Sequence, residues 1–411
     1  MKKIKIRCIE FVVILRIILS LVILLVYCQC KTISKFNQTM KKNVSTSLEL
    51  QSALASLNSS IVSVIEIEPG TYNINANYII SRSNIKITGI GDVTLNLDNV
   101  NGTIKPNTPL LAFVADTAPI TNSTPPIYNI EVSNIKFKGN KIPIVSIIQL
   151  NRVENFSINK CNFYDCGLPI PPPPSHPQLP PPPGWCDCIA ASNRSMGEVS
   201  SCKFYNASKN SIFVSVGCKF INVHNNFIDG GFIGQNRPGI ELRANGFVSG
   251  NLIQNCSGAG ILAISSDPGS VSSETTDSKL DTRSFANIVT GNQIVNCDIG
   301  IAVEATTVYD RNITTLGYEP REDGSVITNN VIIDPITYGI STLNRNGLII
   351  TGNSIINTNP SSPNNMKSSM NLDNLTNSIV TNNILGKPRN EYFFRGSSYS
   401  QGNIHTGTPD N

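Results

Sequence analysis

The chain has 411 residues, of which 40% are hydrophobic and only 15% are charged. Its net charge of +4 is spread thinly, with no Lys/Arg run beyond the N-terminus, which excludes the basic surface of a nucleic-acid-binding protein. The low charge and the abundance of Asn, Ile, Ser, Thr and Gly favour stacked β-strands and exclude a helical bundle.

The first 30 residues have the pattern of a secretory signal peptide, a basic start followed by an apolar stretch at 11–26. That stretch is close to the ~17 residues at which a membrane span becomes possible, so an uncleaved N-terminal membrane anchor is the alternative. Either outcome exports the rest of the chain, which we expect to be secreted or extracellular. We interpret residues 31–44 as a linker.

Export has two chemical consequences. Eight cysteines remain after residue 30, an even number that predicts disulfides, with Cys161/Cys202 and Cys256/Cys297 at equivalent positions of a repeat. Acceptors for N-glycosylation predict a glycoprotein and occur at Asn37, Asn43, Asn58, Asn101, Asn122, Asn155, Asn193, Asn206, Asn255, Asn312 and Asn374.

A short helix and two strands are expected next along the chain. Residues 48–57 have the pattern of an amphipathic helix, and residues 65–67 that of a strand. The sequence Pro-Gly-Thr-Tyr at 69–72 and the strand pattern at 83–89 follow. This helix is placed to cap the first coil of whatever the strands build.

An internal repeat occupies the rest of the chain. Its first element is a turn with Asn or Cys at the start, seen at Cys161, Cys202, Asn226, Asn251, Asn292, Asn330, Asn353 and Asn383. A second element, Gly-Ile followed by alternating residues, appears about nine residues later at 239–242, 260–263, 300–303 and 339–342. Units of ~20 to 30 residues with short strands cannot bury an apolar face alone, so they are expected to stack as a solenoid.

The recurring Asn has a structural explanation. Asn tolerates the left-handed backbone conformation of a sharp corner, and stacked amides can hydrogen-bond along a column. We therefore assign the column a structural role.

These turns resemble the parallel β-helix repeats of the pectin-lyase-like superfamily, and residues 69–72 and 83–89 resemble its first coils. The resemblance covers residues 45–386. It implies an all-β fold, a single-stranded right-handed parallel β-helix (β-solenoid) with an N-terminal helical cap. Residues 387–411 are then expected to form a C-terminal cap or tail.

Four insertions flank one column of strands. The Pro-rich segment 169–184 and residues 230–238 precede that column, whereas 265–284 and 305–323 follow it. Insertions on both sides of a strand face are expected to form the walls of a trough that suits an extended polymer. A solvated spacer is the alternative role of the Pro-rich segment.

Strand alternation selects candidate site residues on this face. If Ile240 and Leu242 point inward, Glu241 and Arg243 point outward, and so does Glu304 two coils further on. Arg243 and Glu304 are then separated by roughly 10 Å, at ~4.8 Å for each coil. Solvated edge charges are the alternative.

Asp187 is the fourth candidate. The sequence Cys-Asp-Cys-Ile-Ala at 186–190 weakly resembles the Asp-Asp-Cys-Ile-Ala strand of polygalacturonases, which implies a catalytic carboxylate at Asp187. Cys186 replaces the first Asp, and Lys-Asn-Ser at 209–211 replaces the family's Gly-His-Gly. These departures argue against polygalacturonase activity.

A lyase instead needs a strong base and groups that neutralise a uronate carboxylate, often with Ca²⁺. Arg237 and Arg243, with Glu241 and Asp229 nearby in sequence, are candidates for these roles. The catalytic set is therefore Arg243, Glu241, Glu304 and Asp187, while any metal ligands and the use of Ca²⁺ stay open.

Three classes of function remain for the chain. The first is a carbohydrate-active enzyme, a uronan lyase, hydrolase or epimerase; the second is a non-catalytic glycan-binding or surface-adhesion protein; the third is a structural protein. The expected partner is a polysaccharide, acidic in character, and the protein is expected to be a monomer.

Overall fold

The structure is a computed structural model. It describes residues 40–99, 102–115, 125–167, 186–215, 218, 220–231, 237–265, 287–305, 321–322, 324–358, 368–386 and 393–405. The expected signal peptide at 1–30, the insertion 169–184 and most of the other three insertions lie outside these residues. Within them, no helix is long and apolar enough to cross a membrane.

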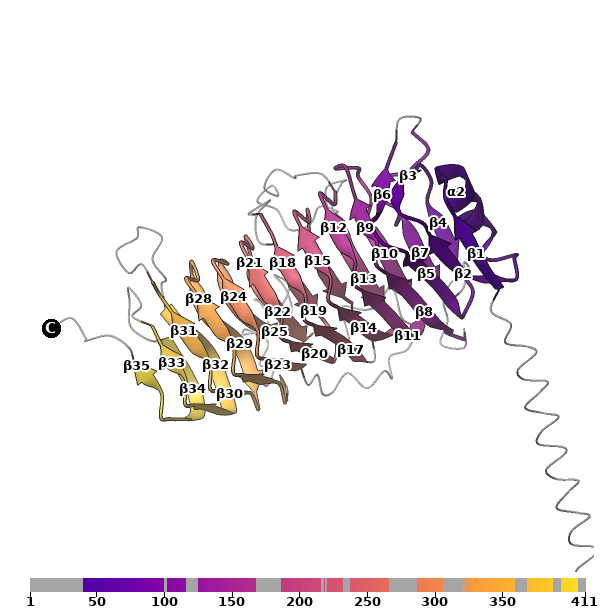
Figure 1. Cartoon of the computed structure of the whole chain (residues 1–411). Coiled ribbons are helices and arrows are strands. Elements are labelled where there is room, and N and C mark those ends of the chain that lie inside the picture. The colour runs from indigo at the N-terminus through magenta and orange to yellow at the C-terminus, as the bar shows by residue number, and fades with distance from the viewer. Residues whose placement is uncertain are drawn as a thin grey trace, which may run out of the picture.

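The chain is a parallel β-helix whose coils stack in sequence order from the N-terminus to the C-terminus (Figure 1). In the described residues every strand pairing is parallel, and a strand within the stack pairs with strands of the preceding and following coils, as β10 pairs with β7 and β13. The pairings follow three ladders, here called ladders 1, 2 and 3. Ladders 1 and 2 join in one 23-stranded sheet, and ladder 3 is a 12-stranded sheet, counted over the described ranges. The predicted solenoid and all-β class are confirmed.

Ladder 1 contains β1 (Met40–Val44), β2 (Val62–Ile67), β5 (Ile85–Gly89), β8 (Ile127–Ser133), β11 (Val153–Asn159), β14 (Met196–Ser200), β17 (Phe220–His224), β20 (Gly246–Ser249), β23 (Asn287–Thr290), β27 (Val326–Thr328) and β30 (Ile349–Thr351). Ladder 2 contains β4 (Tyr78–Ile80), β7 (Leu111–Val114), β10 (Ser146–Asn151), β13 (Asp187–Ser192), β16 (Ile212–Val214), β19 (Ile240–Leu242), β22 (Ala259–Ser265), β25 (Ile299–Ala305) and β29 (Tyr338–Asn346), beside whose end lies β26 (Arg321–Glu322). The long strands β32 (Ser368–Thr381) and β34 (Phe393–Gln401) connect both ladders. Ladder 3 contains β3 (Gly70–Ile74), β6 (Val93–Leu97), β9 (Lys136–Lys138), β12 (Asn162–Tyr164), β15 (Lys203–Tyr205), β18 (Phe227–Asp229), β21 (Leu252–Gln254), β24 (Gln293–Val295), β28 (Val331–Ile333), β31 (Ser354–Ile356), β33 (Ile384–Leu385) and β35 (Ile404–His405).

The interior of the solenoid is filled by every second side chain of each strand. In β2, for example, Ser63, Ile65 and Ile67 are buried while the residues between them are partly exposed. Identical residues of successive coils stack, as the rings of Phe137, Phe163 and Phe204 do at centroid distances of 5.1 and 4.9 Å. Stacking equivalent residues buries apolar surface in every coil, which is the main stabilising contribution to a solenoid.

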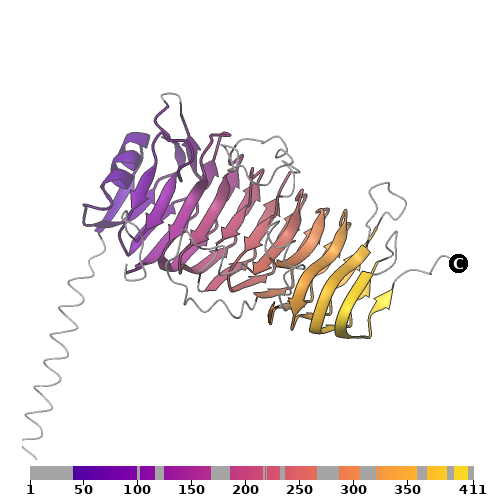
Figure 2. The ribbon, with the colours of Figure 1, turned by 180° about the vertical axis from the view of Figure 1, so that it is seen from behind.

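The predicted helical cap is confirmed as α2 (Ser47–Ser56), which lies at the N-terminal end of the stack (Figures 1 and 2). Thr46 accepts a hydrogen bond from the backbone of Glu49, and the Glu49 side chain accepts from the backbone of Thr46, so the first turn has a capping box. Leu50, Ala53 and Leu54 face the core and close the first coil.

The β-structure extends further at both ends than the sequence indicates. Strand β1 lies in the segment interpreted as a linker and pairs with β2. Strands β34 and β35 lie in the segment expected to be a tail and pair with β32 and β33, adding another coil.

The recurring Asn residues form a buried column at the corner between ladders 1 and 3. The backbone N–H and the Nδ2 of Asn251 both donate to Oδ1 of Asn292, at 3.1 and 2.9 Å. The same two bonds link Asn292 to Asn330, at 3.0 and 2.9 Å. Each Nδ2 also donates to a backbone carbonyl of the preceding coil, for example from Asn292 to Val248 at 3.0 Å. The hydrogen-bonded column is therefore confirmed as a structural element.

The left-handed conformation, however, belongs to the residue before each column Asn. Asn225, Gly250 and Asn329 have φ angles of 56°, 62° and 55°, whereas none of the column Asn residues has a positive φ. A Cβ on Gly250 would lie 2.7 Å from the Oδ1 of Asn225 in the preceding coil. The two properties that we attributed to one Asn are thus divided between neighbours, since one residue turns the chain and the next bonds the coils.

Candidate functional site

A cluster of two buried carboxylates and two partly exposed cations lies on ladder 2, across three successive coils. The strands β13, β16 and β19 are adjacent, and their register places Ala190 beside Phe213 and Phe213 beside Glu241. Alternation along β19 turns Ile240 and Leu242 into the core and Glu241 outward, as predicted. Glu241 is nevertheless only 5% exposed, so it is not a solvated edge charge.

Asp187, at the start of β13, belongs to the same cluster. Its Oδ2 lies 3.0 Å from the Nζ of Lys209, and its Oδ1 accepts a hydrogen bond from the backbone N–H of Asn210 at 3.2 Å. Asp187 is also only 5% exposed. A buried carboxylate requires such partners, because removing a charge from water is costly.

Asn210 connects the two carboxylates. Its Nδ2 donates to Oε2 of Glu241 at 2.9 Å, while its backbone N–H donates to Asp187. The other oxygen of Glu241 accepts from Nε of Arg243 at 2.6 Å. The Oδ1 of Asn210 is buried and accepts no hydrogen bond from the described part of the chain. A buried acceptor without a donor in the described structure therefore lies between two carboxylates.

Phe213 provides the apolar floor of the cluster. The Nζ of Lys209 lies 4.6 Å from the centre of its ring, and the Cζ of Arg243 lies 5.4 Å from it. Both distances are in the cation–π range. An aromatic ring flanked by charged hydrogen-bonding groups is an arrangement suited to a sugar, which has both an apolar face and hydroxyl edges.

The electrostatics of the cluster distinguish its members. Burial raises the pKa of Asp187, and the negative charge of Glu241 raises it further, while Lys209 and the backbone of Asn210 act in the opposite direction. Burial lowers the pKa of Arg237, which is influenced by both Asp187 and Glu241 and therefore lies near them. Asp187 is thus the carboxylate of the cluster that retains a proton to higher pH than an ordinary Asp.

Of the four predicted site residues, three are in contact through a chain of hydrogen bonds, and the fourth, Glu304, lies two coils away. Asn210 links Asp187 to Glu241, and Glu241 in turn pairs with Arg243. The register pairs Glu304 with Ile264, and Ile264 lies one coil beyond Arg243. The backbone of Glu304 is therefore two coils from Arg243, as we expected. Its side chain lies outside the described structure. Ile264 is buried although it has outward parity.

Asp229 does not join the cluster. Its carboxylate accepts hydrogen bonds from Gln254 at 2.8 Å and Asn255 at 3.1 Å at the end of ladder 3. It therefore belongs to a corner network between coils, and the grouping of Asp229 with Arg243 by sequence proximity is wrong. No group of three or more His, Cys, Asp or Glu side chains that could hold a metal ion occurs among the residues that the structure describes.

Sequence reasoning missed Asn210 and Phe213 as members of the site. Asn210 was noted only as a departure from a family motif, although that departure placed an amide between two carboxylates. Phe213 does not figure among the residues that the sequence pattern selects. The signal that was present is the outward parity of Phe213, an aromatic residue that stands between Ala190 and Glu241 in the same column.

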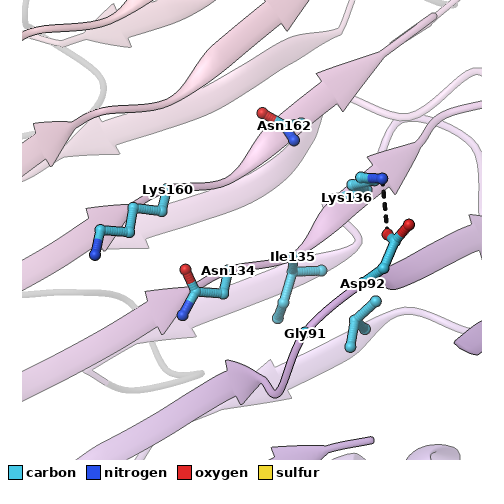
Figure 3. A pocket seen from close by; sticks show the side chains of 8 residues that line it. Gly91, Asp92, Asn134, Ile135, Lys136, Lys160 and Asn162 are labelled. Carbon is cyan, nitrogen blue, oxygen red and sulfur yellow. Dashed lines mark ion pairs between the residues drawn. The ribbon is translucent and has the colours of Figure 1, made fainter. Parts of the chain in front are cut away.

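A pocket of about 480 Å³ lies away from this cluster, at a corner of the N-terminal coils (Figure 3). It is lined by Gly91, Asp92, Val93, Asn134, Ile135, Lys136, Lys160 and Asn162. Lys136 and Asp92 form an ion pair of 2.7 Å with side chains 38% and 72% exposed. Exposed pairs of this kind are screened by solvent and contribute little, so the buried cluster on ladder 2 is the better candidate site.

Comparisons with known proteins agree on the fold. The family described as the right handed beta helix region matches residues 146–319. No curated protein matches the sequence. The chain is similar to the tailspike protein of E. coli bacteriophage HK620 in complex with a pentasaccharide, with a TM-score of 0.62 and 13% identity. That match covers 89% of this chain and 63% of the tailspike chain, so the chain spans less than two thirds of that protein.

A second similar structure is PfbA, a surface adhesin of Streptococcus pneumoniae. Its TM-score is 0.56 at 12% identity, over 87% of this chain and 85% of the adhesin chain. At such identities the likeness shows the fold alone. The predicted right-handed parallel β-helix is confirmed by the family match and by the structures.

Proposed function

We propose that this right-handed parallel β-helix binds polysaccharide across the outer face of ladder 2 and hydrolyses it at the cluster of Asp187, Asn210 and Glu241. The observation that carries the proposal is the pair of buried carboxylates on ladder 2, joined by an amide whose Oδ1 accepts no hydrogen bond in the described structure. The tailspike structure with its pentasaccharide supports a saccharide ligand for a helix of this kind.

The arrangement favours hydrolysis over elimination. A lyase needs a base that is free to take up a proton, but Arg243 is already engaged as a donor to Glu241 at 2.6 Å. Two carboxylates instead suit a glycosidase, in which one donates a proton to the glycosidic oxygen and the other acts as base or nucleophile. Asp187, with its raised pKa, is assigned the proton donor, and Glu241 the second role.

The preferred substrate is an acidic polysaccharide. Three cations, Lys209, Arg237 and Arg243, lie near the two carboxylates, so positive groups outnumber carboxylates in the cluster. A guanidinium can hold a uronate carboxylate in bidentate fashion. Glu304 would extend the site along the helix axis.

A non-catalytic glycan-binding function is the second candidate. It is favoured by the ion pairs of both carboxylates, because Lys209 and Arg243 already neutralise Asp187 and Glu241. The similarity to a surface adhesin supports the same alternative. Only the hydrolytic function converts the polysaccharide, so a measurement of its turnover separates hydrolysis from non-catalytic binding.

We further propose that residues 1–30 direct export and that the mature chain is a disulfide-containing glycoprotein. Among the glycosylation acceptors in the described ranges, Asn43, Asn58 and Asn155 are exposed and so leave room for a glycan. Cysteines of an exported protein meet an oxidising compartment, which favours disulfides.

The test is a panel of acidic and neutral polysaccharides incubated with the purified protein, with binding and new reducing ends both measured. We expect binding and turnover of an acidic member, and a loss of turnover of about 100-fold in Glu241→Gln. Glu131→Gln, which removes an exposed carboxylate paired with Lys86 on ladder 1, is the control and should keep full activity. Binding without reducing ends establishes the second candidate, and the absence of both refutes the site.

A further inference from the structure

The outer face of ladder 3 changes its chemistry along the stack. In β9, β12 and β15 one buried Phe is flanked by two outward residues, which are Lys and Lys, Asn and Tyr, and Lys and Tyr. From β21 to β31 a buried Ile is flanked instead by Leu and Gln, Gln and Val, Val and Ile, and Ser and Ile. The interior needs only the central residue of each strand, so stacking of the coils does not explain the basic and aromatic residues outside.

The aromatic residues of this face form a stack across three coils. The rings of Tyr164 and Tyr205 have centroids 4.9 Å apart and planes within 3° of each other, and the ring of Phe227 lies 5.5 Å from that of Tyr205, tilted by 47°. All three residues are partly exposed. Rings stacked in this way cover each other's faces and present their edges, which carry the positive part of the ring quadrupole. The stack therefore favours a ligand with anionic groups over one with cationic groups.

Lysines stand next to the stack. The register places Lys138 beside Tyr164 and Lys203 beside Phe227, and both lysines are exposed. Within the described part of the chain, neither of them forms an ion pair, and neither does Lys160. An anionic ligand can therefore pair with these lysines without first displacing a carboxylate of the protein.

The pocket of about 480 Å³ lies at the other end of the same strands (Figure 3). Lys136 and Lys160 line it together with Asn162, which the register places beside Lys203. Asp92 is the carboxylate of this pocket and pairs with Lys136 at 2.7 Å. A volume of this size accommodates a small ligand, and its amines and amides suit the hydroxyl and anionic groups of a sugar unit.

These coils are also the coils of the ladder 2 cluster. Strand β12 leads to β13, β15 to β16, and β18 to β19, so the two faces adjoin at one corner of the same three coils. At this corner Nδ2 of Asn206 donates to Oδ1 of Asp165 at 3.1 Å and joins consecutive coils. Only five residues separate Tyr205 of the stack from Asn210 of the cluster along the chain. A long polymer bound at one face thus has the other within its reach.

We propose that the outer face of ladder 3 from β9 to β18, here called the lysine–tyrosine face, is a second, non-catalytic binding surface for an anionic polysaccharide. Lys138, Lys160 and Lys203 pair with its carboxylate or sulfate groups, and the tyrosine stack contacts its sugar rings. The inference goes beyond the proposed hydrolytic site, since it uses other residues and requires no turnover. Two surfaces on adjoining faces raise the affinity for a long chain through effective concentration.

The test measures binding of alginate, dextran sulfate and neutral dextran to the full chain by titration calorimetry, at about 0.05 M and 0.3 M salt. We expect binding of alginate, dextran sulfate or both, weaker at the higher salt concentration, and none of dextran. Alginate alone identifies carboxylates as the recognised groups, and dextran sulfate alone identifies sulfates; either result supports the face. A parent protein that binds neither anionic polymer overturns the inference.

Two double variants locate the binding. Lys138→Gln/Lys203→Gln should weaken binding of the anionic polymer about tenfold. The matched control Lys41→Gln/Lys86→Gln removes the same charge from exposed lysines of ladder 1 and should change the affinity less than about twofold. Because all four side chains are outside the core, melting temperatures should stay close to that of the parent. Equal losses of affinity in the two double variants would show an effect of net charge alone and refute the face.

Two further variants examine the stack and the independence of the face. Tyr205→Ala, which removes the middle ring, should weaken binding several-fold, whereas Tyr205→Phe should recover most of it. The effect of Lys138→Gln/Lys203→Gln should persist in a Glu241→Gln background, and its disappearance there contradicts a separate surface. Since binding is measured without turnover, a failure of the proposed hydrolysis is distinguishable from a failure of this inference.

Discussion

Two buried asparagines of this protein, Asn292 in the corner column and Asn210 in the ladder 2 cluster, are equally hidden, with 1% of each residue exposed. Asn292 uses its whole amide, since its Oδ1 accepts two hydrogen bonds and its Nδ2 donates to Asn330 and to Val248. Asn210 leaves its Oδ1 without a donor in the described structure and stands between two carboxylates. Burial alone thus does not distinguish a structural asparagine from one in the candidate site. The hydrogen bonding of the amide does distinguish them.

The largest effect is expected in the column. Asn292→Leu removes the acceptor of two donors on Asn251 and the donor to Val248. Since each buried group left without a partner costs about 1–3 kcal/mol, we expect a loss of about 3 kcal/mol in the free energy of unfolding, measured by denaturant titration. The neighbouring exposed amide gives the control, Gln293→Leu, which should change it by less than about 0.5 kcal/mol. Equal stabilities of the two variants would contradict a structural column.

The matching change in the cluster should affect binding more than stability. Asn210→Ala removes one hydrogen bond to Glu241 and the available Oδ1, so we expect a stability loss of only about 1 kcal/mol. Affinity for the polysaccharide, measured by titration calorimetry, should fall about tenfold or more. A variant with unchanged affinity and a stability loss as large as that of Asn292→Leu would place Asn210 in the scaffold.

Arg243 tests the charge of the cluster. Its side chain is 31% exposed, but it supplies the ion pair of the buried Glu241. Arg243→Ala should therefore weaken binding of an acidic glycan about tenfold and also lower stability by about 1.5 kcal/mol, because Glu241 loses its cation. Arg243→Lys, which keeps the charge, should recover part of the affinity and part of the stability. Full affinity in Arg243→Ala refutes the contact with the substrate.

The smallest expected effect is a pH dependence. The pKa of Asp187 is raised above 3.8 in the folded state, so its protonated form favours folding, and this contribution is lost as the pH rises from about 3.8 through the raised value. Melting temperatures measured across this range should fall with pH more steeply in the parent than in Asp187→Asn. Turnover, if Asp187 donates the proton, should fall over the same range. Parallel melting curves would contradict a raised pKa.

The sequence by itself determined the solenoid. Repeats of Asn and Gly-Ile at a regular spacing predicted the stacked coils, and residues 48–57 predicted the cap, because periodic apolar residues and corner residues act through local backbone geometry. The outward direction of Glu241 was predicted in the same way, because side chains alternate along a strand and Ile240 and Leu242 face the core.

Only the tertiary structure decided which residues meet. Asp187, Asn210 and Glu241 lie in three different coils, separated by 23 and 31 residues along the chain, and their contacts depend on how the coils align. Sequence proximity grouped Asp229 with Arg243, yet the coil places that carboxylate at another corner, with Gln254 and Asn255. The depth of burial that raises the pKa of Asp187 is likewise a property of neighbouring coils, since desolvation depends on the groups packed around a carboxylate and not on the residues that precede and follow it.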